Sequence, residues 1–430
     1  MEQFVIEGGY PLSGTIKPLG NKNAALTLLA ATLMTDETVV LKNAPPIGDV
    51  LTQIAILRDL GVSVQHPGRD ELTACAASLS KTALNPDFCK RVRGSILLAG
   101  PLLARHGRAT MPSPGGDRIG RRRLDTHLRA LEALGARIET GHGYEMWAPD
   151  GLTGADIFLD ERSVTGTENV IMASTLAEGT TIIRNAASEP HVQELCRLLN
   201  AMGARISGAG TNELTVEGVN ALHGGEHAIG PDYMEVGSFI GLAAVTHGEM
   251  RIRNAAPHHM RRSLMVFERL GVEVTVDGDD ILVPDDQKLE IVRDAGDAIP
   301  KIFDDPWPGF PADLMSIAIV VATQARGTVL FFEKMYESRL FWLDRLIEMG
   351  AEIIICDPHR AVVVGPSKLY GERITSPDIR AGMALLIASL CAEGRSEIRN
   401  IEQIDRGYDR IDERLRTLGA RIERVPVRLG

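Results

Sequence analysis

The chain has 430 residues, which is too many for one ordinary hydrophobic core, so either two domains or an array of repeats is expected. Hydrophobic residues make up 44% of the chain but aromatic residues only 4%, which predicts a core of aliphatic side chains in packed helices and strands. The formal net charge of −11 argues against a general affinity for nucleic acid or for anionic membranes.

The N-terminal sequence MEQFVIEGGY has no basic region followed by an apolar run, so no signal peptide is expected. No apolar stretch reaches the roughly 18 residues of a membrane-spanning helix. The five cysteines lack the spacing of metal ligands, which favours buried free thiols in a reducing compartment. We therefore expect a cytoplasmic protein without a metal or a cofactor.

The first clear pattern along the chain is AALTLLAATLM (24–34), an apolar segment that predicts a buried helix. The alternating residues of TDETVVLKNAP follow it and predict a short strand. The same small turn, short strand and polar exit recur in four later segments: AEGTTIIRNAA, THGEMRIRNAA, ARGTVLFFEK and AEGRSEIRNIE. A unit that joins a buried helix to a short strand is therefore repeated along the chain.

A second pattern alternates with the first and occurs six times. Its copies are LRDLGVSV (57–64), LEALGARI (131–138), LNAMGARI (199–206), FERLGVEV (267–274), LIEMGAEI (346–353) and LRTLGARI (415–422). Apolar residues three and four apart predict an amphipathic helix, and the glycine can take the left-handed conformation that ends it. The alternating residues after the glycine predict the next strand.

Six copies of helix, turn, strand, helix, turn and strand predict an α/β protein with helices packed on sheets. A solenoid is the alternative arrangement, but solenoid repeats are usually about 20 to 50 residues long, shorter than these copies. Two globular lobes of three units each are favoured, and the cleft between them is the expected ligand site.

Two basic segments lie in the first third of the chain. In LGNKNAA (19–25), backbone N–H groups and Lys22 could converge on an anion at a helix start, although its residues alone favour a capped helix with a solvated lysine. The segment SPGGDRIGRRRLDTH (113–127) carries Asp117 and four arginines: Arg118, Arg121, Arg122 and Arg123. Guanidinium groups suit phosphate or carboxylate, but Arg118, Arg121 and Arg123 taken singly read as a solvated face.

Acidic and basic residues later in the chain form a second set. Asp313 in WPGFPADLMS reads locally as a carboxylate in the first turn of a helix. Asp378 follows Ser376 and Pro377, which predict a helix cap and its first residue. Three arginines complete the set: Arg339, Arg380 and Arg406. The sequence lacks a dinucleotide-binding GxGxxG after a strand, a Walker sequence and a GxSxG elbow.

Eight segments, in this order, carry a resemblance to a known family: GNKNAAL, RGSILLAGPLLARHG, PGGDRIGRRRLDTHL, TGTENVIMASTLAEGTTIIRNAA, FPADLM, YESRLF, DIRAGMALLIASLCAEG and IDRGYDRIDERL. The chain resembles the UDP-N-acetylglucosamine 1-carboxyvinyltransferases over roughly residues 3–424. The resemblance implies an inside-out α/β barrel of two lobes, each of three βαβαββ repeats. The first lobe would comprise 1–21 and 231–430, and the second 22–230 with a mobile loop near 112–123.

The resemblance also implies a reaction, the first committed step of peptidoglycan synthesis. The enolpyruvyl group of phosphoenolpyruvate moves to the 3′-hydroxyl of UDP-N-acetylglucosamine, and phosphate is released. The implied phosphoenolpyruvate ligands are Lys22, Arg93, Arg122, Arg339, Arg380 and Arg406. The implied UDP-N-acetylglucosamine ligands are Asn23, Arg93, Arg122, Arg123, Leu124, Asp125, Arg162, Ser163, Val164, Asp313 and Met335. The implied catalytic groups are Lys22, Asp117, Asp313 as base for the hydroxyl, Asp378 and Arg406.

Two positions depart from the family pattern. Asp117 stands where most members carry cysteine, and Arg123 where many carry proline. A cysteine, with a reference pKa near ~8.5, holds its proton at neutral pH, whereas an aspartic acid, near ~3.9, does not. Asp117 is therefore either a proton carrier with an optimum below neutrality or a residue that assists loop closure and product release. Because a carboxylate is a poorer nucleophile than a thiolate, we expect insensitivity to fosfomycin, which alkylates the loop thiol of family members.

Three other assignments compete with this one. A 5-enolpyruvylshikimate-3-phosphate synthase shares the fold and the donor, and a non-catalytic UDP-sugar-binding paralogue would share the acceptor. RNA 3′-phosphate cyclase has a related repeat architecture, but the charge of −11 argues against it. The two small molecules are the expected partners, without nucleic acid or membrane, and the expected state is a monomer.

Overall fold

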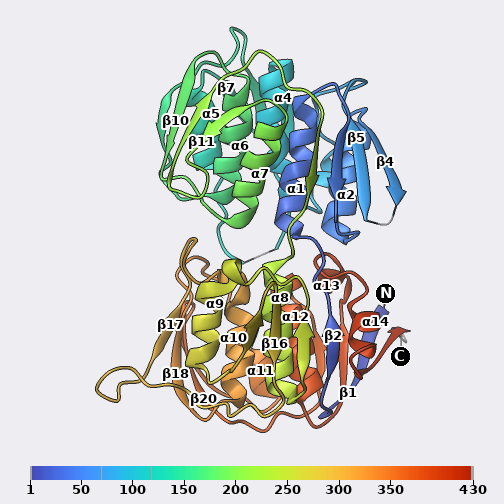
Figure 1. Cartoon of the computed structure of the whole chain (residues 1–430), viewed down its shortest axis with the longest axis vertical. Coiled ribbons are helices and arrows are strands. Elements are labelled where there is room, and N and C mark those ends of the chain that lie inside the picture. The colour runs from blue at the N-terminus through green and yellow to red at the C-terminus, as the bar shows by residue number, and fades with distance from the viewer. Residues whose placement is uncertain (1, 69, 118, 428–430) are drawn as a thin grey trace. The chain divides into compact units, whose positions relative to one another are not determined.

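The computed structural model describes residues 2–68, 70–117 and 119–427, and its contacts divide them into two compact units (Figure 1). The first unit contains residues 2–19, 119–121 and 231–427 of the described chain. The second contains 20–68, 70–117 and 122–230. Residues 119–121 therefore belong to the first unit, whereas the sequence-based division placed all of 112–123 in the second.

Among the described residues, the first unit has twelve strands and seven helices. Its strands are β1 (Glu2–Gly8), β2 (Gly14–Ile16), β14 (Met250–Ile252), β15 (Thr275–Asp277), β16 (Asp280–Val283), β17 (Lys301–Phe303), β18 (Gly327–Phe332), β19 (Glu352–Asp357), β20 (Arg360–Gly365), β21 (Arg373–Thr375), β22 (Gly394–Arg399) and β23 (Arg421–Pro426). Its helices are α8 (Tyr233–Thr246), α9 (Pro257–Arg269), α10 (Ala312–Gln324), α11 (Leu343–Glu348), α12 (Ile379–Cys391), α13 (Glu402–Asp405) and α14 (Ile411–Arg416).

The second unit repeats the same succession of elements. Its strands are β3 (Val39–Lys42), β4 (Ser63–Gly68), β5 (Glu71–Cys75), β6 (Arg108–Pro112), β7 (Arg137–Thr140), β8 (Gly143–Trp147), β9 (Asp156–Phe158), β10 (Thr180–Arg184), β11 (Arg205–Ser207), β12 (Glu213–Glu217) and β13 (Gly225–Ala228). Its helices are α1 (Lys22–Ala31), η1 (Thr32–Met34), α2 (Gly48–Asp59), α3 (Pro86–Cys89), η2 (Arg93–Leu98), α4 (Ala99–His106), α5 (Asp125–Ala133), α6 (Val164–Thr175) and α7 (Pro190–Ala201).

The described strands form six sheets, and in five of them a parallel pair is extended by two further strands that pair antiparallel. The orders in the first unit are β21-β22-β1-β23, β15-β16-β14-β2 and β17-β18-β20-β19. Those in the second unit are β13-β3-β5-β4, β11-β12-β10-β9 and β6-β8-β7, the last joined by a parallel bridge between Ala83 and Thr110. The succession β9-α6-β10-α7-β11-β12 shows the βαβαββ repeat directly.

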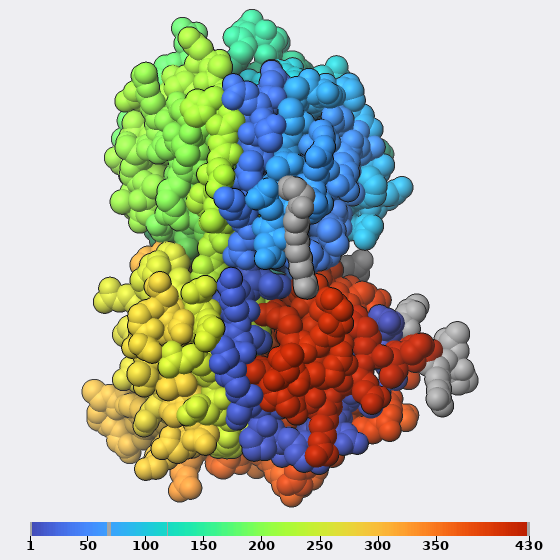
Figure 2. Space-filling view, turned by 45° about the vertical axis from the view of Figure 1, so that its right-hand side comes forward, coloured from blue at the N-terminus to red at the C-terminus, as the bar shows by residue number. Residues whose placement is uncertain are grey.

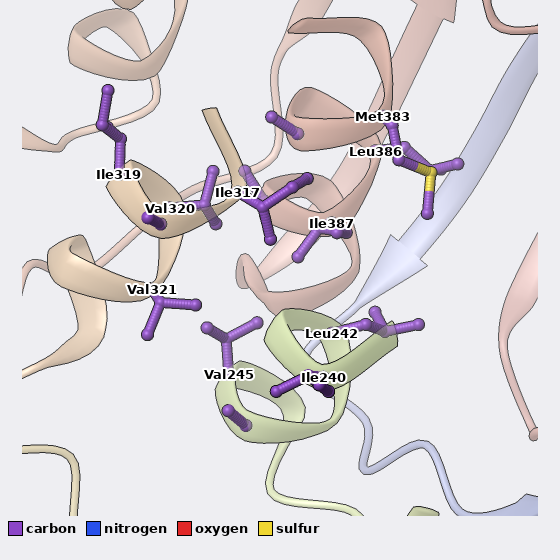
Figure 3. Close-up of a cluster of buried hydrophobic side chains, with 14 of the residues drawn as sticks. Ile240, Leu242, Val245, Ile317, Ile319, Val320, Val321, Met383, Leu386 and Ile387 are labelled. Carbon is purple, nitrogen blue, oxygen red and sulfur yellow. The ribbon is translucent and has the colours of Figure 1, made fainter. Parts of the chain in front are cut away.

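Three apolar helices, α8, α10 and α12, form the centre of the first unit. They are hydrophobic all round and nearly every residue is buried, as expected for helices without a solvent face. Figure 3 shows their aliphatic side chains meeting, with Val245 of α8, Val321 of α10 and Ile387 of α12 in one cluster. Charged residues occur only near the N-terminal ends of these helices, which is where the candidate site lies.

The predicted glycine stops are confirmed. The six glycines have φ between 82° and 107°, and each follows one of the outer helices. They are Gly61 after α2, Gly135 after α5, Gly203 after α7, Gly271 after α9, Gly350 after α11 and Gly419 after α14. A side chain with a Cβ atom rarely adopts this conformation, which is why the glycine is readable from the sequence.

The cysteines are free, as expected, but they are not all buried. Cys89 and Cys196 are buried, whereas Cys356 is exposed on β19, the outermost strand of its sheet. Within the described ranges, no helix combines the length and the apolar character needed to cross a membrane.

Candidate active site

Asp313 of the first unit lies between two buried arginines. It sits in the first turn of α10, directly after Pro311 and Ala312. Its Oδ1 atom accepts a hydrogen bond from Arg339 Nη2, and its Oδ2 atom accepts one from Arg380 Nε at 2.9 Å. The arginine side chains are only 7% and 6% exposed, while that of Asp313 is 29% exposed. The carboxylate is therefore held on both oxygens and remains open to a ligand.

Both guanidinium groups stay charged in this setting. Burial is the largest single influence and opposes the charge, but the nearby acidic groups, with Asp313 first among them, together outweigh it, so the pKa values of Arg339 and Arg380 are raised. The Nε atom of Arg339 is buried and has no hydrogen-bond partner among the described residues. A buried donor without a partner is rare in proteins, and an anionic ligand would satisfy it.

A second set of contacts fixes Arg380. Its Nη1 atom lies 3.3 Å from the hydroxyl of Tyr408, which in turn lies 3.1 Å from Ser238 Oγ. Asp378 caps α12 by accepting from the backbone N–H groups of Arg380 and Ala381, at 2.8 and 2.9 Å. The capping interpretation of Asp378 is thus confirmed, but the helix begins after Asp378, at Ile379, rather than at Pro377.

Arg406 and Met335 also belong to the first unit. Arg406 follows α13 and its Nη1 atom donates to Gln403 Oε1 at 2.9 Å, while Tyr408 stands two residues further on. Met335 is 41% exposed on the segment between β18 and α11 that also carries Arg339. The structure thus connects Arg406 to the Asp313 group through the segment of Tyr408.

Lys22 of the second unit is not the solvated lysine that its local sequence suggests. Asn21 caps α1 by accepting from the backbone of Ala24, and Lys22 pairs with Asp49 of α2 at 3.0 Å. The lysine side chain is only 12% exposed. The solvated interpretation failed because its partner is 27 residues away along the chain. Asn23 follows at the same helix start and is half-buried.

Arg93 and Arg122 lie together in the second unit. The Nη2 atom of Arg93 donates to the carbonyl oxygens of Arg122 and Arg123, at 2.8 and 3.4 Å. A Cβ atom at Gly116 would lie 2.9 Å from the Cβ of Arg93 and 3.5 Å from Arg122 Nη1. The glycine therefore lets the backbone next to Asp117 approach both arginines.

The residues predicted to face the nucleotide gather at two neighbouring helix starts. Leu124 and Asp125 begin α5, and Ser163 and Val164 begin α6, where Ser163 Oγ accepts from Gly166 N at 3.1 Å. The two helices are joined by a hydrogen bond of 2.8 Å between His127 Nε2 and Thr165 Oγ1. Helix N-termini carry partial positive charge and bind phosphate groups.

Two arginines flank these helix starts. Arg123 is exposed and donates to Asp125 Oδ2 at 2.9 Å, so its interpretation as a surface residue is confirmed. Arg162 Nε lies 3.4 Å from Asn185 Oδ1.

The segment after β6 connects the two units. Asp117 is half-buried, Arg118 lies outside the described residues, and Arg121 is exposed. Within the first unit, Ser338 N donates to Ile119 O at 3.1 Å and Arg121 N donates to Glu337 Oε2 at 3.2 Å. Residues 119–121 are thus bound to the segment that carries Arg339. Sequence reasoning missed Glu337, although it lies within the quoted YESRLF segment.

Comparisons with known proteins identify the family of the chain. The pattern of the family described as EPSP synthase (3-phosphoshikimate 1-carboxyvinyltransferase) matches residues 6–415. A UDP-N-acetylglucosamine 1-carboxyvinyltransferase of Treponema denticola is 55% identical over 98% of this chain and 99% of its own length. One of the same name from Bradyrhizobium diazoefficiens is 55% identical over 99% of each chain. The chain belongs to the UDP-N-acetylglucosamine 1-carboxyvinyltransferase family.

Solved structures show that this member of the family has the expected enolpyruvyl transferase fold. The enolpyruvyl transferase NikO of Streptomyces tendae superposes with a TM-score of 0.89 at 23% identity, over 99% of each chain. An EPSP synthase of Acinetobacter baumannii gives 0.76 at 19% identity, over 99% of this chain and 100% of that one. The predicted fold class is therefore confirmed.

A buried pair of acids supports the segment that carries Met335 and Arg339 in this family member. Asp304 and Glu333 are both fully buried. Asp304 accepts from the backbone N–H groups of Lys334 at 2.5 Å and Met335 at 3.2 Å, and Glu333 Oε1 accepts from Tyr336 N at 3.2 Å. Burial, and then the hydrogen bond and charge of Asp304, raise the pKa of Glu333 to about 9. Glu333 therefore keeps its proton at neutral pH.

Glu333 should make stability fall with pH. An acid whose pKa is higher in the folded state holds a proton that the unfolded chain releases, so stability is lost from about pH 4.5 up to about pH 9. The loss is at most about 1.4 kcal/mol per pH unit. Glu333→Gln keeps a hydrogen-bond donor toward Asp304 but has no group that loses a proton in this range. The midpoint of thermal unfolding of the variant should therefore fall less between pH 5 and 9 than that of the native chain. Parallel curves for the native chain and the variant would contradict this prediction, and the exposed Glu393→Gln is the control.

Proposed function

We propose that this chain transfers the enolpyruvyl group of phosphoenolpyruvate to the 3′-hydroxyl of UDP-N-acetylglucosamine, with release of phosphate. Relatives that carry this activity in their names are 50 to 55% identical over nearly the whole chain. The structural observation that carries the proposal is Asp313, an accessible carboxylate on two buried guanidinium groups, one of which has an N–H without a partner among the described residues.

The first unit supplies the groups suited to the carboxylate of phosphoenolpyruvate. Arg339 and Arg380 present planar donors that match a carboxylate, and at present they donate to Asp313. Two guanidinium groups stabilise the ionised form of Asp313 and weaken it as a base. When the substrate carboxylate takes over these donors, Asp313 loses that stabilisation and becomes a stronger base.

Asp313 then takes the proton of the 3′-hydroxyl as the oxygen bonds to C2 of phosphoenolpyruvate. The double bond gains a proton at C3, which gives a tetrahedral intermediate. Loss of a proton from C3 and departure of phosphate restore the alkene, so atoms and charge balance. Asp117 is the candidate acid for C3, and Asp378 the companion carboxylate beside Arg380. Both roles stay predictions.

The phosphate groups need further cations, and Lys22, Arg93, Arg122 and Arg406 are the candidates. Arg93 and Arg122 are already neighbours, and Lys22 is on the adjacent helix: Leu26, one turn after it, lies 3.1 Å from a Cβ placed at Gly94. The starts of α5 and α6, with Arg123 and Arg162 beside them, are the candidate surface for the diphosphate and uridine. Asn23 and Met335 are the candidates that face the sugar.

The test is phosphate release from phosphoenolpyruvate with each of two acceptors, across pH 5 to 9. We expect turnover with UDP-N-acetylglucosamine and none with shikimate 3-phosphate. Turnover with shikimate 3-phosphate alone would favour the synthase, and binding of the UDP-sugar without turnover would favour a non-catalytic paralogue. The described residues hold no group of three or more His, Cys, Asp or Glu that could bind a metal ion. Cytoplasmic location and the monomeric state stay predictions from the sequence.

A further inference from the structure

The segment 406–410 carries two groups of the candidate site and is held in a strained conformation. Arg406 is a candidate phosphate ligand, and Tyr408 contacts Arg380. Arg410 ends the segment with φ at 43°, a left-handed conformation that costs energy for any residue other than glycine. Such a conformation persists only where the surroundings hold it.

The same segment packs against the start of α12. A Cβ atom at Gly407 would lie 2.5 Å from Cγ2 of Ile379, which immediately precedes Arg380. The backbone of the segment therefore sets the position of Arg406 and also touches the helix end that carries Arg380. A shift of this segment would disturb both arginines.

One guanidinium group joins the two ends of the segment. Arg424 of β23 forms two hydrogen bonds of 2.8 Å with Asp405, the residue before Arg406. Its Nη2 atom also donates to Asp412 Oδ1 at 2.9 Å, and Asp412 lies in the first turn of α14, just after the segment. The hydrogen bond with Asp405 is the largest of the influences that raise the pKa of Arg424, so the group is permanently charged.

The strand that carries Arg424 is itself firmly held. β23 pairs along its whole length with β1, from Glu2↔Pro426 to Glu7↔Arg421. Figure 2 shows this N-terminal segment in blue beside the C-terminal segment in red. Arg424 also reaches Glu2 at 3.3 Å and lies over the ring of Phe4. The guanidinium of Arg424 thus extends from a fully paired strand, and its N–H groups bind the residues on either side of the segment 406–410.

We infer that Arg424 is a positioning residue for the transfer reaction, acting through Asp405 and Asp412 to hold Arg406 and Tyr408 in place. This inference rests on the proposed function, in which Arg406 binds the phosphate of phosphoenolpyruvate. Arg424 itself contacts no substrate. Its planar fork binds two carboxylates at once, and a lysine, as a single ammonium group, cannot reproduce that geometry.

The test compares Arg424→Met and Arg424→Lys with Arg416→Met as the matched control. Arg416 also binds Asp412, through Oδ2 at 3.2 Å, but within the described residues it forms no hydrogen bond with Asp405. Its loss therefore leaves the bonds of Arg424 to Asp405 and Asp412 in place. We expect Arg424→Met to raise KM for phosphoenolpyruvate about tenfold, with less than a twofold change in KM for UDP-N-acetylglucosamine. Arg424→Lys should fall between Arg424→Met and the native chain, and Arg416→Met should stay within twofold of the native chain.

Thermal unfolding of each variant separates positioning from loss of fold. If Arg424→Met raises both KM values by the same factor, the inference is wrong. It is also wrong if kcat and the melting temperature of the variant both fall while its KM values stay unchanged. If the native chain releases no phosphate, the proposed function fails instead. Calorimetric binding of phosphoenolpyruvate then still compares the native chain with Arg424→Met, and equal affinity overturns the inference.

Discussion

Replacing Asp313 with asparagine should lower kcat about 10²- to 10⁴-fold, the usual contribution of a positioned general base. The amide cannot take the proton of the sugar hydroxyl, but it keeps nearly the same shape between Arg339 and Arg380. Because these guanidinium groups lose an anionic competitor, phosphoenolpyruvate should bind as tightly as before or more tightly. We therefore expect a large fall in kcat with an unchanged or lower KM for phosphoenolpyruvate.

Phosphate release at saturating UDP-N-acetylglucosamine measures both constants. Asp305→Asn is the matched control, since Asp305 lies eight residues earlier, is half exposed and pairs with Lys334 rather than with a buried arginine. Removing one partner of a buried ion pair also destabilises a protein, so melting temperatures of both variants are needed. A kcat within threefold of the native value in a folded Asp313→Asn protein would remove Asp313 from the role of base.

The repeat pattern made the fold readable from the sequence. Each glycine of the six phrases has a left-handed backbone conformation that other residues rarely adopt, and each apolar helix is buried in the centre of its unit. The residues that the local backbone requires are therefore also those that the fold requires. The start of α12 was placed too early because Ser376 and Pro377 also fit a helix start, and only the contacts of Asp378 decide between the two. The sixth sheet contains the strand predicted after LEALGARI, but its bridge at Ala83, in place of a full strand, was not predicted from the sequence.

The site was less readable because its pairs are distant in the chain. Asp313 and Arg380 are 67 residues apart, and Lys22 and Asp49 are 27 apart. Locally, Asp313 is an acidic residue in the first turn of a helix, which is favourable without any function. The resemblance to a family assigned Arg339 and Arg380 to the same site as Asp313, and both contact it in the structure. It did not indicate Asp49, Tyr408 or the acid pair of Asp304 and Glu333, which contact other groups of the protein.

The native chain should resist inactivation by fosfomycin, and Asp117→Cys should become sensitive to it. A thiolate opens an epoxide far more readily than a carboxylate, and a cysteine with an ordinary pKa near ~8.5 is a few per cent thiolate at neutral pH. Arg93 and Arg122 beside the Gly116 backbone would favour the thiolate further and draw in the anionic inhibitor. The measurement is residual activity against time of incubation, and we expect a progressive loss in the variant alone.

The chain supplies its own control, because Cys356 is an exposed thiol on β19 and is not one of the predicted site residues. The native protein thus already has an exposed thiol. If Asp117→Cys alone becomes sensitive, the sensitivity depends on where the thiol lies and not merely on its exposure. Asp117→Cys combined with Cys356→Ser should remain sensitive, and Asp117→Asn should remain resistant. Time-dependent inactivation of the native chain that persists in Asp117→Asn would show that another residue reacts, and the role given to position 117 would then be wrong.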